Sequence, residues 1–373
     1  MRKEFLIGVA MMLGTSIGVG VFGIPYVIKS GFVSGLISII LLGLAFMFIN
    51  LSLGETLLRT KGNHQLCGIM EIYLGKTGKW FMLASLTIGI YGALAAYVTG
   101  AGEVLSQMFG FSKVFWEIVF FAVGLSFVFG GFKRFAKSQL WSNITKLTVF
   151  VIIALILLLS SEFKTGNLSG FSNFFSSWGV ILFAYICTSV IPVVKLELGK
   201  NLKLLKSVLI WASIIPIIVY AVFTIGIIGV SGNFTTDVAT IGAAFAIGGI
   251  AGLLINLFAI LAMLTAFPSL SFALSEVFIL DFGFSKLWAM IATFSIPIVI
   301  ILVGASFTGI LEIAGAFSSG IAGISVLWAY LRARKHGQRK PEYSLNLQLW
   351  FVLLLMVIFL VGIWFGIKEL FGF

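Results

Sequence analysis

The sequence contains few charged residues. Only 10% of its 373 residues are charged, whereas about 25% is usual for a soluble domain. Hydrophobic residues make up 60%, and the mean hydropathy is +1.16. No stretch between the apolar runs is long enough to form a soluble domain. This composition excludes an ordinary soluble enzyme and indicates a polytopic membrane protein.

Cysteine and histidine are also scarce. Cys67 and Cys187 lie far apart and without metal-ligand spacing, so we expect neither a disulfide framework nor a metal site. His64 and His336 both fall in predicted loops, so no metal cluster or Ser-His pair is expected within the membrane. No phosphate-cradling Gly-x-x-x-x-Gly-Lys motif is present, which argues against direct use of ATP. The expected cofactor is therefore none, apart from a coupling ion, H⁺ or Na⁺.

Long apolar runs are what the sequence has in abundance. Each is long enough for a helix that crosses a bilayer. They predict an all-α polytopic membrane protein with about eleven transmembrane helices, at residues 5–28, 32–58, 80–109, 113–131, 139–160, 174–198, 206–231, 247–274, 286–305, 309–331 and 347–371.

The net charge of +11 is distributed unevenly among the loops. With the N-terminus placed in the cytoplasm, most Lys and Arg residues fall at inner helix ends and loops. Only Lys29, Lys113, Lys164 and Lys368 fall outside. Basic residues favour the cytoplasmic side, so we expect a cytoplasmic N-terminus and, with an odd number of spans, an external C-terminus. The expected location is the plasma membrane, with the lipid bilayer and not nucleic acid as the partner.

A glycine-rich stretch lies inside the first run. Gly14 to Pro25 holds four glycines and a proline. Gly costs about 1 kcal/mol and Pro about 3 kcal/mol relative to Ala inside a helix, so a break is expected. Many secondary transporters hold an anionic substrate group and a coupling ion at such breaks. The alternative is a continuous glycine-rich helix that packs closely on its neighbours.

The sixth run contains a second interruption at residues 185–192, where Pro192 removes a backbone donor. The first and sixth spans stand five positions apart and start from opposite sides of the membrane. They would therefore begin two inverted five-helix repeats, 1–160 and 161–335, followed by a basic loop and an eleventh helix at 336–373. Matched interruptions favour a transporter. A channel is an alternative, although neither a filter-like repeat nor a ring of charges is evident.

Residues at the two breaks are the candidate substrate-binding residues. Backbone N–H groups near the glycines would bind a substrate carboxylate, because glycine lets a ligand approach closely. The hydroxyl groups either join this site or bond back within their own helix. The candidates are Thr15, Ser16, Gly18 and Gly20 at the first break, and Tyr185, Cys187 and Thr188 at the second.

The third run adds Tyr97 and Glu103. Tyr97 would close over the substrate, or it packs as an ordinary core residue. Glu103 is a carboxylate within a predicted span. A charged group inside a membrane is energetically costly, so its presence suggests a function. It either carries a proton or lies at the outer water boundary. Glu55 and Glu312 fall near helix ends, where we expect the membrane interface.

Three stretches resemble one known family. The run from Tyr91 to Glu103 resembles the third span of the bacterial hydroxy and aromatic amino acid permeases, which include tyrosine-specific and tryptophan-specific transporters. Gly14 to Pro25 is similar to their first span, and Tyr73 to Trp80 resembles the loop before the third. The sixth span departs, because Tyr185-Ile186-Cys187-Thr188 replaces a Phe-Gly-Phe-His-like run.

The resemblance implies the five-plus-five inverted-repeat fold of the amino acid–polyamine–organocation superfamily, with one extra helix. It also implies a secondary transporter that works by alternating access. Together with the near absence of acidic residues around either break, it predicts a neutral amino acid substrate, more apolar or aromatic than charged.

The resemblance further implies a role for Lys146. In the implied fold the fifth span packs beside the first and eighth, near a sodium site of some relatives. In other relatives a lysine ammonium stands in for that ion. Thr265 and Ser269 of the eighth span would then accept hydrogen bonds from Lys146. Transport would be proton-coupled or independent of sodium. The alternative is a sodium-coupled symporter. In that case the Lys146 side chain snorkels toward the cytoplasm and does not replace the ion.

Overall fold

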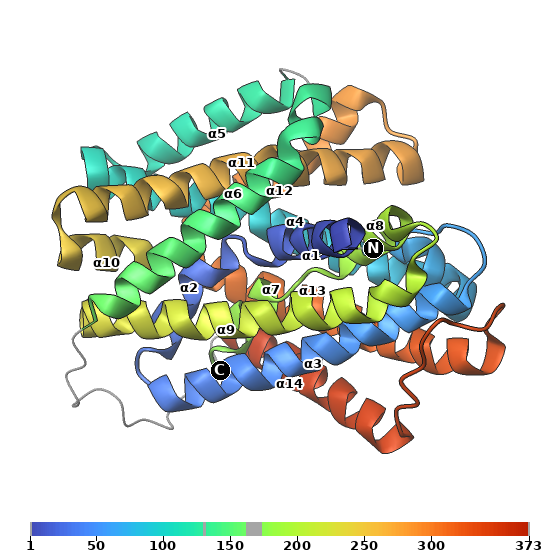
Figure 1. Cartoon of the computed structure of the whole chain (residues 1–373). Helices are drawn as coiled ribbons and strands as arrows, with labels where there is room; N and C mark the ends of the chain where they lie inside the picture. The colour runs from blue at the N-terminus through green and yellow to red at the C-terminus, as the bar shows by residue number, and fades with distance from the viewer. Residues whose placement is uncertain (1, 130–131, 162–173, 372–373) are drawn as a thin grey trace.

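The computed structural model describes residues 2–129, 132–161 and 174–371, and over these residues the chain is all-α (Figure 1). This confirms the predicted fold class. The end of the expected run 113–131 and the segment 162–173 lie outside the described residues. The helices are α1 (Arg2–Ser16), α2 (Gly20–Ile28), α3 (Phe32–Arg59), α4 (Leu66–Phe109), α5 (Lys113–Phe129), α6 (Phe132–Leu159), α7 (Trp178–Ala184), α8 (Ile191–Leu198), α9 (Leu205–Ser231), α10 (Ala239–Ile247), α11 (Gly249–Phe282), α12 (Lys286–Val303), α13 (Phe307–His336) and α14 (Leu349–Phe371).

Most of these helices are long enough to cross a membrane. Among the described residues, eight helical segments are sufficiently long and apolar, and the bent pair α1 and α2 makes a ninth. Two further apolar segments are shorter than the 18 residues of the shortest of these eight segments. They are α5, with 17 residues, and the described apolar part of α6, Ile144–Leu159. Each expected run coincides with a helix or a broken pair of helices. The total of eleven spans and the repeat boundaries at residues 160 and 335 remain predictions. Helix α10 was not expected.

The broken helices lie in the middle of the bundle, with α5 and α14 at opposite edges (Figure 1). Helices α9 and α6 pack against α1, and α3 and α13 pack against α7. Small residues permit these close contacts, as they do in many membrane bundles. A Cβ atom at Gly92 of α4 would lie 2.2 Å from Cβ of Ala314 in α13, and one at Gly315 would lie 2.0 Å from the carbonyl oxygen of Gly179 in α7.

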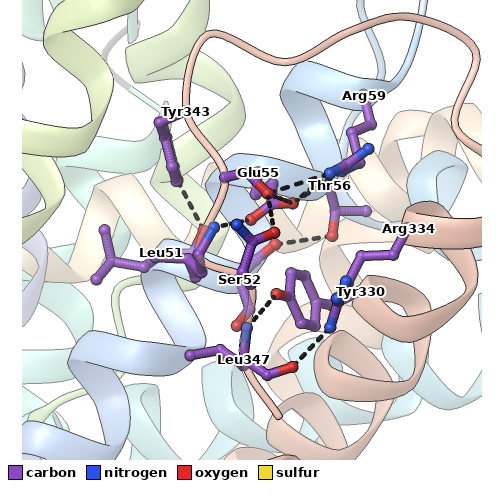
Figure 2. A network of polar contacts seen from close by, with 12 residues as sticks. Leu51, Ser52, Glu55, Thr56, Arg59, Tyr330, Arg334, Tyr343 and Leu347 are labelled. Carbon is purple, nitrogen blue, oxygen red and sulfur yellow. Dashed lines mark hydrogen bonds and ion pairs between the residues drawn. The ribbon is translucent and has the colours of Figure 1, made fainter. Parts of the chain in front are cut away.

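A buried carboxylate fastens the connection between α13 and α14 to the end of α3 (Figure 2). Glu55 lies near the end of α3, as expected, and is fully buried by the protein. It accepts hydrogen bonds from Arg59 Nε at 2.8 Å, from the Leu345 N–H at 2.7 Å and from Ser344 Oγ at 3.1 Å. These bonds satisfy a carboxylate that lies away from water.

Further bonds hold the same connection in place. The Tyr343 hydroxyl donates to the carbonyl oxygen of Leu51 at 2.7 Å (Figure 2). Burial raises the pKa of Tyr343 well above its usual range, so the phenol remains a donor at physiological pH. The N–H groups of Gln338 and Arg339 donate to the carbonyl oxygen of Arg59. We call the segment 337–348 the strap.

The strap gives a stability prediction. Replacing Glu55 by Ala leaves Arg59 and the Leu345 N–H without their buried acceptor. Breaking a buried pair in this way costs about 3–5 kcal/mol, so we expect the apparent melting temperature of detergent-purified protein to fall by about 5 °C or more. Glu71→Ala is the control, because Glu71 forms a largely exposed ion pair with Lys79 at 3.0 Å. Equal melting temperatures for the two variants would contradict the assignment.

Candidate functional site

Two helix breaks meet at the centre of the bundle. Helix α1 ends at Ser16 and α2 begins at Gly20, with their axes bent by 55°. Helix α7 ends at Ala184, and α8 begins at Ile191 after a short 3₁₀ turn. Helix α2 contacts α7 and α1 contacts α8, which places the breaks side by side. The residue before α2, Val19, provides no side-chain cap, so the first N–H groups of α2 face the break without one.

A tyrosine that sequence analysis did not single out joins the two breaks. Tyr220 of α9 is fully buried, and its hydroxyl lies 2.6 Å from the carbonyl oxygen of Ser16 and 2.9 Å from that of Ala184. Both carbonyls sit at helix ends, where intrahelical donors run out. One shared hydroxyl hydrogen therefore supports both ends in a region without water. The sequence feature that could have drawn attention to Tyr220 is its polar hydroxyl group within the apolar run 206–231.

The predicted residues of the first break differ in their surroundings. Thr15 is exposed, and its hydroxyl donates to Met11 of its own helix at 3.1 Å, the alternative considered from sequence. Ser16 is 3% exposed, and its Oγ has no hydrogen-bond partner among the described residues. A Cβ atom at Gly18 would meet only the Thr15 carbonyl at 3.8 Å and the Tyr97 hydroxyl at 4.0 Å. Tyr97 thus lies beside the first break.

The surroundings of Gly20 are much tighter than those of Gly18. A Cβ atom there would lie 2.8 Å from Cα of Ala184, closer than real Cβ contacts. The absent side chain lets α2 approach α7. Packing of the two broken helices therefore gives this glycine a structural role.

At the second break, Tyr185 and Cys187 are buried and bonded within the protein. The Tyr185 hydroxyl donates to the Ile39 carbonyl at 3.0 Å, and its ring lies 5.1 Å from that of Tyr220. Cys187 Sγ accepts from Asn50 Nδ2 at 3.5 Å. Thr188 is buried at the start of the 3₁₀ turn. Tyr185 and Cys187 thus contribute to the shape of the break.

A narrow space lies between the two breaks and helices α3 and α9. It is too small for a water-sized sphere. Asn50 and Ser213 line it and were not singled out from sequence, because a single buried amide in an apolar run gives no periodic signal. Its lining residues are Ser16, Gly43, Phe46, Asn50, Tyr185, Cys187, Ala212, Ser213 and Pro216. We call it the central space.

The predicted coupling residues on α6 and α11 are not joined by hydrogen bonds. Lys146 is partly exposed and makes no hydrogen bond or ion pair with any residue that the structure describes. Thr265 donates to the Leu261 carbonyl of its own helix at 2.9 Å, and no bond links Ser269 to Lys146. Helix α6 does pack against both α1 and α11, the arrangement implied for the fifth span.

The two remaining candidate carboxylates have partners. Glu103 lies near the end of α4 and is 2.6 Å from Lys113 Nζ at the start of α5. Glu312 is 6% exposed and accepts from the N–H groups of Gly179 and Val180 at 2.9 and 3.0 Å. It therefore caps the N-terminus of α7 from a buried position near the start of α13. Within the described residues no cluster of His, Cys, Asp or Glu is suited to a metal.

The family follows from comparison with known proteins. Residues 1–365 match the family model described as tryptophan/tyrosine permease. The chain belongs to the tryptophan/tyrosine permease family. This membership confirms the resemblance seen in the first and third spans, and it makes the protein a membrane permease and not an enzyme.

Individual relatives are distant. The permease is 27% identical over 291 residues to tyrosine-specific transport system 1 of Haemophilus influenzae, covering 71% of this chain and 70% of that protein. It is 23% identical over 310 residues to glutamine transporter 2 of Aliivibrio fischeri, covering 79% and 80%. These names describe the relatives' substrates.

Solved structures show the same fold. The nucleobase-cation-symport-1 family transporter Mhp1, closed with bromovinylhydantoin bound, has a TM-score of 0.61 at 14% identity, covering 98% of this chain and 91% of that chain. Inward-facing Mhp1 has a TM-score of 0.64 at 13% identity, covering 97% and 88%. The likeness confirms the expected transporter fold class.

The two glycines of the first break give a paired prediction. Gly20→Ala forces α2 away from α7, and overpacking of this kind costs about 1–3 kcal/mol. We expect lower yield and a broadened size-exclusion profile. Gly18→Ala meets only ordinary contacts, so we expect it to fold normally by the same measurement. A Gly20→Ala variant as stable as Gly18→Ala would contradict the close contact at Ala184.

Proposed function

We propose that this permease is a secondary active transporter that moves a neutral amino acid across the plasma membrane by alternating access. The observation that carries this proposal is the meeting of two broken helices at one place, tied together by Tyr220. The relatives named as tyrosine-specific and glutamine transporters support an amino acid as the cargo.

The helix ends suit the two charges of an amino acid. The uncapped N–H groups at the start of α2, beside Gly18 and Gly20, would bind the substrate carboxylate at the positive end of the helix dipole. The carbonyl oxygens of Ser16 and Ala184 lie at the negative ends of α1 and α7. The Ser16 carbonyl already accepts from the Gly18 N–H at 2.9 Å and from Tyr220, whereas the Ala184 carbonyl retains a lone pair beyond the one facing Tyr220 and would accept from the substrate ammonium group.

The surroundings favour a neutral substrate side chain. None of the residues that line the central space is charged. A charged side chain there would be buried without a partner, which is strongly unfavourable. Tyr97, beside Gly18, would contribute its ring to the same site.

Uptake into proteoliposomes tests this function. We expect labelled neutral amino acids such as tyrosine, tryptophan or glutamine to accumulate, and an internal pool of unlabelled substrate to drive counterflow. A channel would conduct without saturable counterflow. Efficient transport of arginine or glutamate, without transport of neutral amino acids, would contradict the proposal.

We also propose that Lys146 replaces a sodium ion in coupling. Support comes from its position on α6, which packs against α1 and α11, and from the absence of any ion pair to the described residues. An ammonium group with no partner among the described residues is available to interact with carbonyl groups at the first break as the helices rearrange. Thr265 and Ser269 on α11 would be its hydroxyl acceptors.

This proposal predicts transport without sodium. Lys146→Ala should lose transport, or lose its dependence on pH, while the purified protein keeps its melting temperature. Lys286→Ala is the control, because Lys286 is exposed at the start of α12. Strict sodium dependence of the wild type, or an unchanged rate and pH profile in Lys146→Ala, would refute the role.

We also propose the orientation of the protein in the membrane, from the positions of its loops. Segments expected in the cytoplasm meet at one end of the molecule. Lys195 near the end of α8 donates to the carbonyl oxygens of Leu57 and Gly62 at 3.0 and 3.1 Å, and the strap bonds to Arg59. This end carries the basic residues of the sequence's inner loops, so we place it, with the N-terminus, in the cytoplasm.

A further inference from the structure

Asn50 is a buried amide at the edge of the central space. It is 1% exposed and comes from α3. Its Nδ2 lies 3.2 Å from Ser213 Oγ of α9 and 3.5 Å from Cys187 Sγ at the second break. This side chain therefore touches the break that the proposed function uses.

The neighbours of Asn50 fix the orientation of its amide. Ser213 donates its single hydroxyl hydrogen to the Leu209 carbonyl at 2.8 Å. It can therefore only accept from Asn50, which places the amide nitrogen toward Ser213 and Cys187. The amide oxygen, Oδ1, is consequently directed elsewhere, and it has no hydrogen-bond partner among the described residues.

A second polar atom without a partner lines the same space. Ser16 Oγ, at the end of α1, is buried and likewise has no partner within the described chain. Buried polar side chains nearly always have a hydrogen-bond partner, and a lone exception requires an explanation. Here two exceptions, Ser16 and Asn50, border one space between the breaks.

The chemistry of these atoms defines what would satisfy them. An amide oxygen only accepts hydrogen bonds, whereas a serine hydroxyl either donates or accepts. The missing partner is thus a donor. It is an uncharged donor, because no carboxylate lines the space to balance a cation.

We propose that Asn50 is a specificity-determining residue that accepts a hydrogen bond from the end of the substrate side chain. The substrates are then neutral amino acids whose side chains end in an uncharged donor, namely a phenol hydroxyl, an indole N–H or a primary amide. This inference rests on the proposed function and narrows its substrate class. The central space widens to admit the donor when the breaks rearrange around substrate.

Matched pairs of competitors test the wild-type protein in proteoliposomes. Tyrosine is compared with phenylalanine, and tryptophan with its benzothiophene analogue, in which sulfur replaces the indole N–H. A site that hydrogen-bonds a substrate group rejects the analogue without that group, so we expect each donor-bearing member to compete at least about tenfold better. Equal competition within both pairs would overturn the proposal.

A variant then assigns the preference to Asn50. Asn50→Leu keeps the size of the side chain and removes the acceptor, so the competition ratios should fall to near one. Asn256→Leu is the matched control, because Asn256 of α11 is also buried, also has an Oδ1 without a partner, and does not line the central space. It should keep the wild-type ratios. Unchanged ratios in Asn50→Leu would refute the assignment.

The outcomes separate this inference from the function on which it rests. If no neutral amino acid is transported, the proposed function fails. If neutral amino acids are transported but the pairs compete equally, only the role of Asn50 fails. The wild-type pairs decide the second case even if Asn50→Leu does not fold.

Discussion

The structure depends on one hydroxyl group shared between two helix ends. A membrane interior supplies no water to a broken backbone, so each interrupted helix needs an internal partner for its last carbonyls. Tyr220 meets this need for Ser16 and Ala184 together. Because one side chain serves both breaks, the two interruptions are held against each other. The polar groups to which we assign the amino acid backbone in the proposed function are thereby concentrated at one position, while the surrounding helices are mostly apolar.

Three carboxylates of the described chain form contacts away from the two breaks. Glu55 and Lys195 fasten α3 to the strap and to α8 at one end, and Glu103 pairs with Lys113 where α4 meets α5. Glu312 is the buried exception, and backbone N–H groups of α7 hold it. Each carboxylate therefore has donors of its own. The residues that line the central space carry no charge, which is the physical reason for proposing a neutral cargo.

Local sequence was sufficient for the features that local chemistry controls. The apolar runs predicted the helices, and glycine and proline content indicated where α1 and α7 end. The roles of Asn50, Tyr220 and Glu55 depend on partners far away in the chain, which no periodic pattern reveals. Gly20 has a packing role that the sequence could not show, for a related reason. A glycine that lets a ligand approach and a glycine that lets a helix approach are identical in sequence, and only the position of Ala184 distinguishes them.

Helix α3 connects the central space to the strap. Asn50 contacts the second break, and Glu55, little more than one helical turn further on, holds the strap. The carbonyl of Leu57 then accepts from Lys195 of α8. Any movement that separates α8 from α3 breaks charge-assisted hydrogen bonds worth about 1.5–3 kcal/mol each. Reversing a 1:99 equilibrium between two states requires about 5.5 kcal/mol, so a few such bonds are comparable in size to what substrate binding would have to offset in the alternating access that we propose.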